Sequence, residues 1–153
     1  MSRVSSKVMI GRWVYLDIPD VALYNVKAKV DTGAFRSSLH CEFIGAFAED
    51  GETYLKIRTT DMSGEPISEE PMTVRQVGTA RVRSSNGEQQ ERPIVLLDVI
   101  INGEHHSTEF TLSNREDLKF PILLGRKLLR NAFVVDVSLD DPEDPDSPED
   151  END

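Results

Sequence analysis

Apolar side chains recur in short runs along the chain, and residues that favour turns separate these runs. In one run, Val26, Ala28 and Val30 alternate with Lys27 and Lys29. A period of two places the first set on the buried face of a strand and the second set on its exposed face. Long segments with a period of 3.6 residues are scarce. The pattern therefore predicts an all-β fold of the barrel or sandwich type.

The apolar runs and the turn signals between them delimit the predicted elements. Strands are predicted at residues 8–18, 23–30, 43–48, 54–60, 72–84, 92–101, 106–112, 121–125 and 133–137. Three dipeptides supply the positive φ angles of tight turns and predict β-hairpins: Asp50-Gly51, Asn86-Gly87 and Asn102-Gly103. Residues 61–71 form the longest predicted loop. Residues 126–131 are the exception to the β pattern, because they predict one or two helical turns.

The net charge of −11 is concentrated at one end of the chain. Residues 140–153 contain nine of the 28 acidic side chains and no basic one, which leaves residues 1–139 with 19 acids, 17 bases and a net charge of −2. Residues 1–139 are therefore predicted to form one domain, and residues 140–153 a disordered acidic tail that is too polar to fold. Nucleic acid is not an expected partner, because no basic surplus or stripe is present.

Cys41 is the only cysteine, so the chain cannot form an internal disulfide or a zinc site of several thiolates. A buried and unreactive thiol is the expected state of this side chain. No apolar run approaches the ~20 residues of a membrane-spanning helix, and the first residues lack the apolar segment of a signal peptide. These features predict a cytoplasmic protein without a membrane partner.

The apolar run that ends at Val30 leads directly into Asp31, Thr32, Gly33 and Ala34. A carboxylate in this position can act as a general base or acid on water, provided that its surroundings adjust its pKa. Thr32 offers a hydroxyl on a stiff side chain that could join two such loops, and Gly33 leaves room for a turn and a substrate chain. Asp-Thr-Gly also marks ordinary turns, which is the alternative interpretation.

A second element, about ninety residues downstream, changes this interpretation. Residues 122–126 read Ile-Leu-Leu-Gly-Arg and precede the predicted helix. An apolar strand leading into Asp-Thr-Gly-Ala, followed later by such an apolar-Gly-Arg element, resembles the retropepsin family of aspartic peptidases. The resemblance is closest to bacterial retropepsin-like proteins that are often labelled ATP-dependent zinc proteases. The segments that carry it are residues 29–34, 37–40, 82–87, 91–93, 120–126 and 133–136.

The resemblance implies a closed, mostly antiparallel barrel with one short helix near the C-terminus, in which residues 122–126 pass beneath the Asp31 loop. It also implies an aspartic endopeptidase, in which two carboxylates share one proton and hold a water between them. The chain has a single Asp-Thr-Gly, so the second Asp31 is expected from another copy in a homodimer. Asp61 is the alternative within the chain, but no apolar strand precedes it.

The chain departs from the patterns that the resemblance implies at two positions. In viral retropepsins an acid follows the Asp-Thr-Gly-Ala tetrad and pairs with the arginine of the Gly-Arg element, whereas Phe35 stands there in this chain. Arg126 therefore contacts another acid, the cleft or solvent. In the bacterial family a basic residue and a threonine would be usual where this chain has Phe35 and Arg36. Because acidic tails repel one another, a dimer is expected to form through the barrel.

No metal or other cofactor is expected. The histidines are His40, His105 and His106; the HExxH motif is absent, and adjacent histidines in a strand point to opposite faces. A metal held by His40 with Asp31 is the alternative, although His40 is expected to pack or form hydrogen bonds behind the active loop. The chain also lacks a glycine-rich phosphate loop, so any use of ATP would belong to a partner.

The resemblance also suggests a substrate and a partner. The family tends to be associated with an ATP-grasp glutamate ligase that adds glutamates to a protein tail, so an acidic peptide is the expected substrate. Arginines bind carboxylates bidentately. The candidate substrate-binding residues are Ala34, Arg36, Arg81, Arg83, Arg92 and Arg126. Solvent-exposed strand positions are the alternative for several of these arginines. The acidic tail could mimic such a substrate, or it could serve solubility alone.

Two functions from different classes follow. The first is a homodimeric aspartic endopeptidase in which Asp31, Thr32 and Gly33 of each copy form the catalytic site. The second is a monomeric barrel module that binds acidic peptides without cleaving them.

Overall fold

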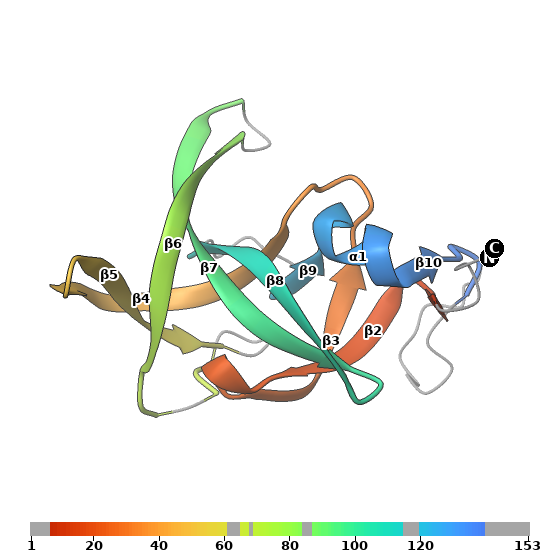
Figure 1. The fold of residues 1–153 in the computed structure, drawn as a ribbon, viewed down its shortest axis with the longest axis horizontal. Helices are drawn as coiled ribbons and strands as arrows, with labels where there is room; N and C mark the ends of the chain where they lie inside the picture. Colours follow the sequence, from red (N-terminus) through yellow and green to blue (C-terminus); the bar gives the residue numbers. More distant parts are fainter. Residues whose placement is uncertain (1–6, 61–64, 68, 84–86, 115–119, 140–153) are drawn as a thin grey trace.

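The computed structural model describes residues 7–60, 65–67, 69–83, 87–114 and 120–139. Within these residues the chain is mostly β-strand, with one short α-helix near the C-terminus, as the sequence predicts (Figure 1). The elements are β1 (Val8–Ile10), β2 (Trp13–Ile18), the 3-10 turn η2 (Pro19–Val21), β3 (Leu23–Val30), β4 (Ser37–Glu49), β5 (Glu52–Thr59), β6 (Met72–Arg83), β7 (Gln89–Ile101), β8 (Glu104–Ser113), β9 (Ile122–Leu124), α1 (Arg126–Ala132) and β10 (Phe133–Val135).

Eight strands form one sheet in the order β2-β3-β9-β4-β5-β6-β7-β8, and further pairings of β2 with β7 and of β4 with β8 close it into a ring. β4 and β7 allow this closure because each spans 13 residues and pairs with different neighbours along its length. The first part of β4 runs parallel to β8, whereas its later part forms a hairpin with β5 that projects from the ring (Figure 1). The ring agrees with the closed, mostly antiparallel sheet expected from the sequence.

A core of apolar side chains from all ten strands and from α1 holds the fold together. Phe110 of β8 and Val95 of β7 are fully buried, and Cys41 of β4 is buried with them. Burial raises the pKa of the Cys41 thiol to about 12 and outweighs a hydrogen bond with the Ser113 backbone. The predicted burial of this thiol is confirmed, and its high pKa accounts for the low reactivity that the sequence analysis expects.

Tight turns confirm two of the three predicted hairpins. Asp50 and Gly51 have φ angles of 55° and 79°, and Asn102 and Gly103 have φ angles of 53° and 78°. These left-handed conformations connect β4 to β5 and β7 to β8. Asn86 of the third predicted turn lies outside the described residues, although β6 and β7 on either side of it do pair. Asp61 and residues 140–153 also lie outside them.

The single strand predicted over residues 8–18 is wrong. The structure divides it into β1, which pairs in parallel with β10, and β2, which pairs with β3. The break falls at Gly11 and Arg12, where the Arg12 backbone N–H donates to Leu139 O at 3.3 Å. A Cβ on Gly11 would collide with the Leu139 backbone, so this close approach of two distant segments requires glycine.

The strand predicted over residues 43–48 begins six residues earlier, at Ser37 of β4. The added residues 37–40 pair with β8 on one side and, in part, with β9 on the other. These partners are about 70–90 residues away in the sequence, so local patterning did not indicate the pairing.

The predicted helical turns are confirmed as α1, which spans seven residues. Its Leu128 and Leu129 side chains are buried, and Phe133 follows directly as the first residue of β10. In the described ranges, no helix is both long and apolar enough to cross a membrane.

Candidate active site

The Asp31 loop connects the end of β3 to the start of β4. The Asp31 backbone N–H donates to Leu124 O of β9 at 2.9 Å, and Ala34 N–H donates back to Asp31 O at 3.2 Å. Gly33 N–H donates to the Asp31 carboxylate at Oδ1, at 3.0 Å. The loop therefore fixes one carboxylate oxygen, while the Thr32 and Gly33 residues beside it are exposed. Asp31 itself is half-buried.

Gly125 lies beneath this loop, at the junction of β9 and α1. Its backbone N–H donates to Ser37 Oγ at 3.0 Å. A Cβ on Gly125 would lie 2.5 Å from Arg36 O and 2.8 Å from Phe35 O. Contacts of this kind leave no room for any side chain, so glycine here sets how closely β9 approaches the loop. This is the crossing that the resemblance to retropepsins implies.

The first residues of α1 complete the support of the loop. Arg126 N–H donates to Ala34 O at 2.9 Å, and Lys127 N–H donates to Phe35 O at 2.8 Å. The Arg126 guanidinium also donates from Nη1 to Thr32 O at 3.0 Å. The sequence left the partner of Arg126 open, and the structure provides the loop backbone in place of an acid. Thr32, Ala34 and Phe35 are thus tied to α1.

Four cationic side chains surround the ring of Phe35, which is 40% exposed. Their charged groups lie 5.5–6.0 Å from the ring centroid, within the range of cation–π contacts. Phe35 and these side chains are called the Phe35 cluster below: Phe35, Arg36, Arg126, Lys127 and Arg130. Sequence reasoning missed Lys127 and Arg130. The sequence did contain a signal for both residues, because Lys127 and Arg130 follow Arg126 by one and four positions in the predicted helix.

Glu109 of β8 provides the negative charge that contacts the cluster. Its Oε1 accepts hydrogen bonds from Lys127 Nζ at 2.9 Å and from Arg36 Nε at 3.0 Å. The hydrogen bond from Lys127, followed by that from Arg36, holds the pKa of Glu109 below its ordinary value near 4.5. Arg36, predicted to bind substrate, is therefore already engaged by an acid, and two cations share that acid.

The family model described as RimB-like, retropepsin-like aspartic endopeptidase RimB, matches residues 9–144. The chain belongs to this family. A solved structure of a Legionella pneumophila protein of unknown function has the same fold, with a TM-score of 0.72 and 27% identity, over 88% of this chain and 96% of that one. The resemblance to bacterial retropepsin-like aspartic peptidases inferred from the sequence is confirmed.

Curated relatives of this RimB-like chain are named as ligases and not as peptidases. Two proteins named probable alpha-L-glutamate ligase match it, one from Desulfotalea psychrophila with 30% identity over 91% of this chain and one from Shewanella pealeana with 29% identity over 87%. The chain spans only 30% and 29% of their respective lengths. The RimB-like domain therefore corresponds to less than a third of each of these ligase-named proteins.

Two of the arginines predicted to bind substrate do not belong to the Phe35 cluster and lie in β6 of this RimB-like fold. Arg81 and Arg83 are exposed near the end of β6, and Arg81 pairs with Glu91 of β7 at 3.5 Å. The β6–β7 hairpin rises on the same side of the ring as the loop that follows β3 (Figure 1). The contact of these arginines with a substrate stays a prediction.

Two of the three histidines contact residues outside the Asp31 loop. His105 Nδ1 lies 2.6 Å from Asp98 Oδ2, whereas the ring of His106 lies 5.2 Å from that of Phe133. His40 is half-buried in β4. Within the described ranges, no three His, Cys, Asp or Glu side chains gather so that they could hold a metal ion.

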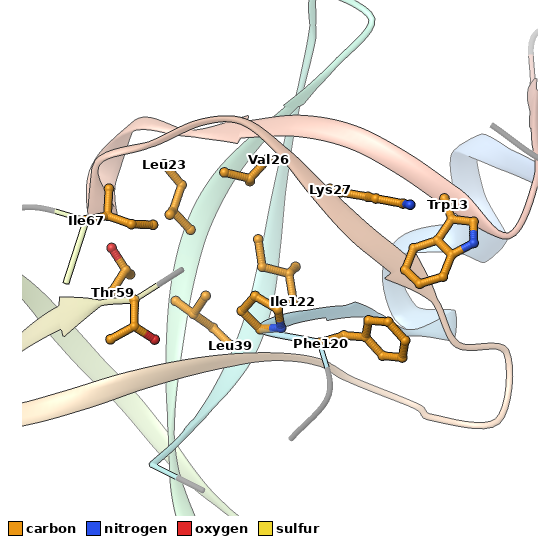
Figure 2. Close-up of a pocket in the computed structure, with 11 residues that line it drawn as sticks. Trp13, Leu23, Val26, Lys27, Leu39, Thr59, Ile67, Phe120 and Ile122 are labelled. Atoms are coloured by element: carbon orange, nitrogen blue, oxygen red, sulfur yellow. The ribbon is translucent and has the colours of Figure 1, made fainter. Parts of the chain in front are cut away.

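A separate apolar pocket of about 220 Å³ lies between β3 on one side and β4, the end of β5 and residues 120–122 on the other (Figure 2). Its lining consists of Trp13, Leu23, Val26, Lys27, Leu39, Thr59, Thr60, Ile67, Phe120, Pro121 and Ile122. At one end, the rings of Trp13 and Phe120 meet edge to face with centroids 4.8 Å apart. The pocket contacts the beginning of β9, whereas Asp31 is bonded to its end. It is therefore distinct from the Asp31 loop.

The acidity of Glu109 leads to a testable dependence of stability on pH. A carboxyl whose pKa is lowered by folding stabilises the protein above its unfolded pKa, and this contribution is lost as the pH falls through the folded value. We expect Glu109→Gln to lower the urea midpoint at pH 7, and the difference from the wild type to shrink as the pH falls through the lowered pKa of Glu109. Glu52→Gln, which removes one exposed pair with Arg75, is the control and should have little effect. A difference that did not vary with pH would contradict this assignment.

Proposed function

We propose that this chain is an aspartic peptidase that acts as a homodimer, with Asp31 of each copy forming the catalytic pair. The observation that carries the proposal is the Asp31 loop itself. Gly33 N–H holds its carboxylate, and hydrogen bonds join the loop backbone to β9 and α1. The Thr32 and Gly33 residues stay exposed. The RimB-like family description, which names an aspartic endopeptidase, supports the same chemistry.

The proposed reaction uses both carboxylates and one water. The ionised Asp31 accepts a proton from the water as the water oxygen attacks the carbonyl carbon of the peptide bond. The protonated Asp31 of the other copy donates its proton to the carbonyl oxygen. The tetrahedral intermediate then collapses as a proton moves to the amide nitrogen, which releases an amine and a carboxylic acid. No bond forms between the protein and the substrate.

Exposed residues of the loop have supporting roles in this proposal. Thr32 would join the two loops through its hydroxyl, and Gly33 would leave space for the substrate backbone. Ala34 would contact the substrate beside the catalytic carboxylate. These assignments follow the order of the residues along a loop whose position is fixed by Leu124 and Arg126.

The proposed substrate is an acidic peptide, and the proposed partner is a glutamate ligase. Relatives that contain a similar segment within a longer chain are named glutamate ligases, which supports a shared process. Arg36 and Arg126 next to the loop support the recognition of acidic side chains. The proposed location is the cytoplasm, where a single buried thiol such as Cys41 stays reduced.

A dependence on protein concentration separates this proposal from a monomeric peptide-binding module. We expect the activity per chain on a glutamate-rich peptide to rise with concentration, because each active site needs two copies. Sedimentation with the peptide present should give twice the chain mass of 17.2 kDa. A monomer that binds the peptide without cleaving it at high concentration would support the module instead.

A further inference from the structure

We propose that the Phe35 cluster, together with an adjoining cavity between β8 and α1, is a carboxylate-binding site that recognises the acidic side chains of a peptide beside Asp31. The proposal deepens the proposed function, on which it rests for its substrate. Binding at this site does not require cleavage, so the two can be tested separately.

The first argument is the charge of the cluster. Glu109 forms ion pairs with both Arg36 and Lys127, so one carboxylate serves two cations. Arg126 and Arg130 have no carboxylate partner among the described residues. Among the described residues, four cations therefore surround the Phe35 ring, and one carboxylate, that of Glu109, offsets their charge. An additional anion would lower their mutual repulsion.

The second argument is the space next to these cations. A cavity of about 380 Å³ lies between β8 and α1, and Lys127 and Arg130 both line it. Ser107, Asn131 and His106 add polar groups to the lining, and Glu109, the acid that pairs with Lys127, lines the cavity as well. The His106 Nε2 atom is buried without a hydrogen-bond partner among the described residues. With Lys127 paired to Glu109, the lining has one positive charge in excess, on Arg130, beside polar groups suited to a hydrogen-bonding anion.

The third argument is the link between the cluster and the catalytic loop. The Arg126 guanidinium donates to Thr32 O, next to Asp31, and the Lys127 backbone donates to Phe35 O. A peptide whose carboxylates contact the cluster would therefore have its backbone near Asp31. Arginine forks favour carboxylates held bidentately, and residues 1–139 lack the basic surplus of a nucleic-acid surface. These features favour an acidic peptide as the ligand.

Binding is best measured on the full-length chain carrying Asp31→Asn, so that the probe is not cleaved. The probes are fluorescein-labelled hexaglutamate and hexaglutamine, followed by fluorescence anisotropy. Arg130→Gln and Lys127→Gln are introduced singly. Arg75→Gln is the matched control, because it removes the same charge from the separate pair with Glu52. Circular dichroism verifies that each variant is folded.

We expect hexaglutamate to bind and hexaglutamine to bind at least about tenfold more weakly, because each lost charge-assisted hydrogen bond has about this effect. Arg130→Gln and Lys127→Gln should each weaken hexaglutamate binding by about tenfold, whereas Arg75→Gln should leave it unchanged. Equal binding of both probes would overturn the proposal. So would an equal loss in all three variants, or tighter binding of an oligonucleotide of the same charge.

A further experiment distinguishes two sources of the acidic ligand, the chain's own tail and an external peptide. Replacing the nine acids of residues 140–153 by their amides keeps the chain at full length. Tighter hexaglutamate binding by this variant would support the cluster as a site that the chain's own tail also occupies. Unchanged binding would support the cluster as a site for external peptides alone. If hexaglutamate binds as expected but wild-type protein cleaves no acidic peptide, the peptidase proposal fails and the binding site stands.

Discussion

Asp31→Asn should reduce peptide cleavage by at least about 10³-fold, because an amide can neither accept the proton of water nor share one with a second carboxylate. The substitution preserves shape, and the amide oxygen can still accept the Gly33 N–H, so the loop should keep its conformation. Cleavage of a glutamate-rich peptide, measured by mass spectrometry, provides the test. Asp17→Asn is the matched control, because Asp17 also accepts a backbone N–H, from Asn25, and lies in β2.

Mixing the two proteins tests whether the catalytic pair spans two copies. At equal concentrations of wild type and Asp31→Asn, random pairing leaves about a quarter of the dimers with two Asp31 carboxylates. Activity should therefore fall to about a quarter of that of wild type at the same total concentration. Independent active sites would retain half, and that result would contradict a shared pair. Full activity of Asp31→Asn alone would exclude Asp31 from the chemistry.

Gly125→Ala should lower the free energy of unfolding by about 3 kcal/mol, since the added Cβ would lie 2.5 Å from Arg36 O. Backbone atoms on both sides prevent local relief, so β9 must move away from the Asp31 loop. Such a loss corresponds to a decrease in Tm of roughly 6–12 °C. Urea unfolding and calorimetry would measure the two quantities.

The control for this substitution is Gly45→Ala in the β4–β5 hairpin. A Cβ there meets no atom within 4 Å, so the same chemical change should alter stability by less than about 1 kcal/mol. Similar losses in both variants would show that glycine itself, and not the close approach beneath the loop, determines the effect. We expect Gly125→Ala to lower peptidase activity as well, because it displaces the support of Asp31.

Local signals in the sequence predicted most of the strands and the turns between them. Asp50-Gly51 and Asn102-Gly103 adopt the left-handed conformations expected of hairpins, and β3 has its predicted bounds. The strand predicted across Gly11 failed because a distant segment ends it there. The early start of β4 was missed for a related reason, as its partners are far away in the sequence. Period and turn chemistry contain no such long-range information.

The candidate site was predictable only in part. Asp31 and Gly125 could be identified because each belongs to a motif, and the structure places them on adjoining segments. Glu109 could not be identified, because it is one acid among 28 and its role depends on the pairing of β8 with β4. The position of Phe35 was noted as a departure, but the four cations around it became apparent only once α1 was placed against the loop.

The parallel pairing of β1 with β10, outside the ring, places the first and last strands of the domain side by side, with Val8 opposite Phe133 and Ile10 opposite Val135. A polypeptide that enters the domain at β1 and leaves it after β10 does so at one point on its surface. Domains with adjacent ends tolerate insertion into other chains, because neither connection has to cross the fold. The same ring can therefore be incorporated into a much longer protein as a pendant module, without opening the sheet that supports Asp31.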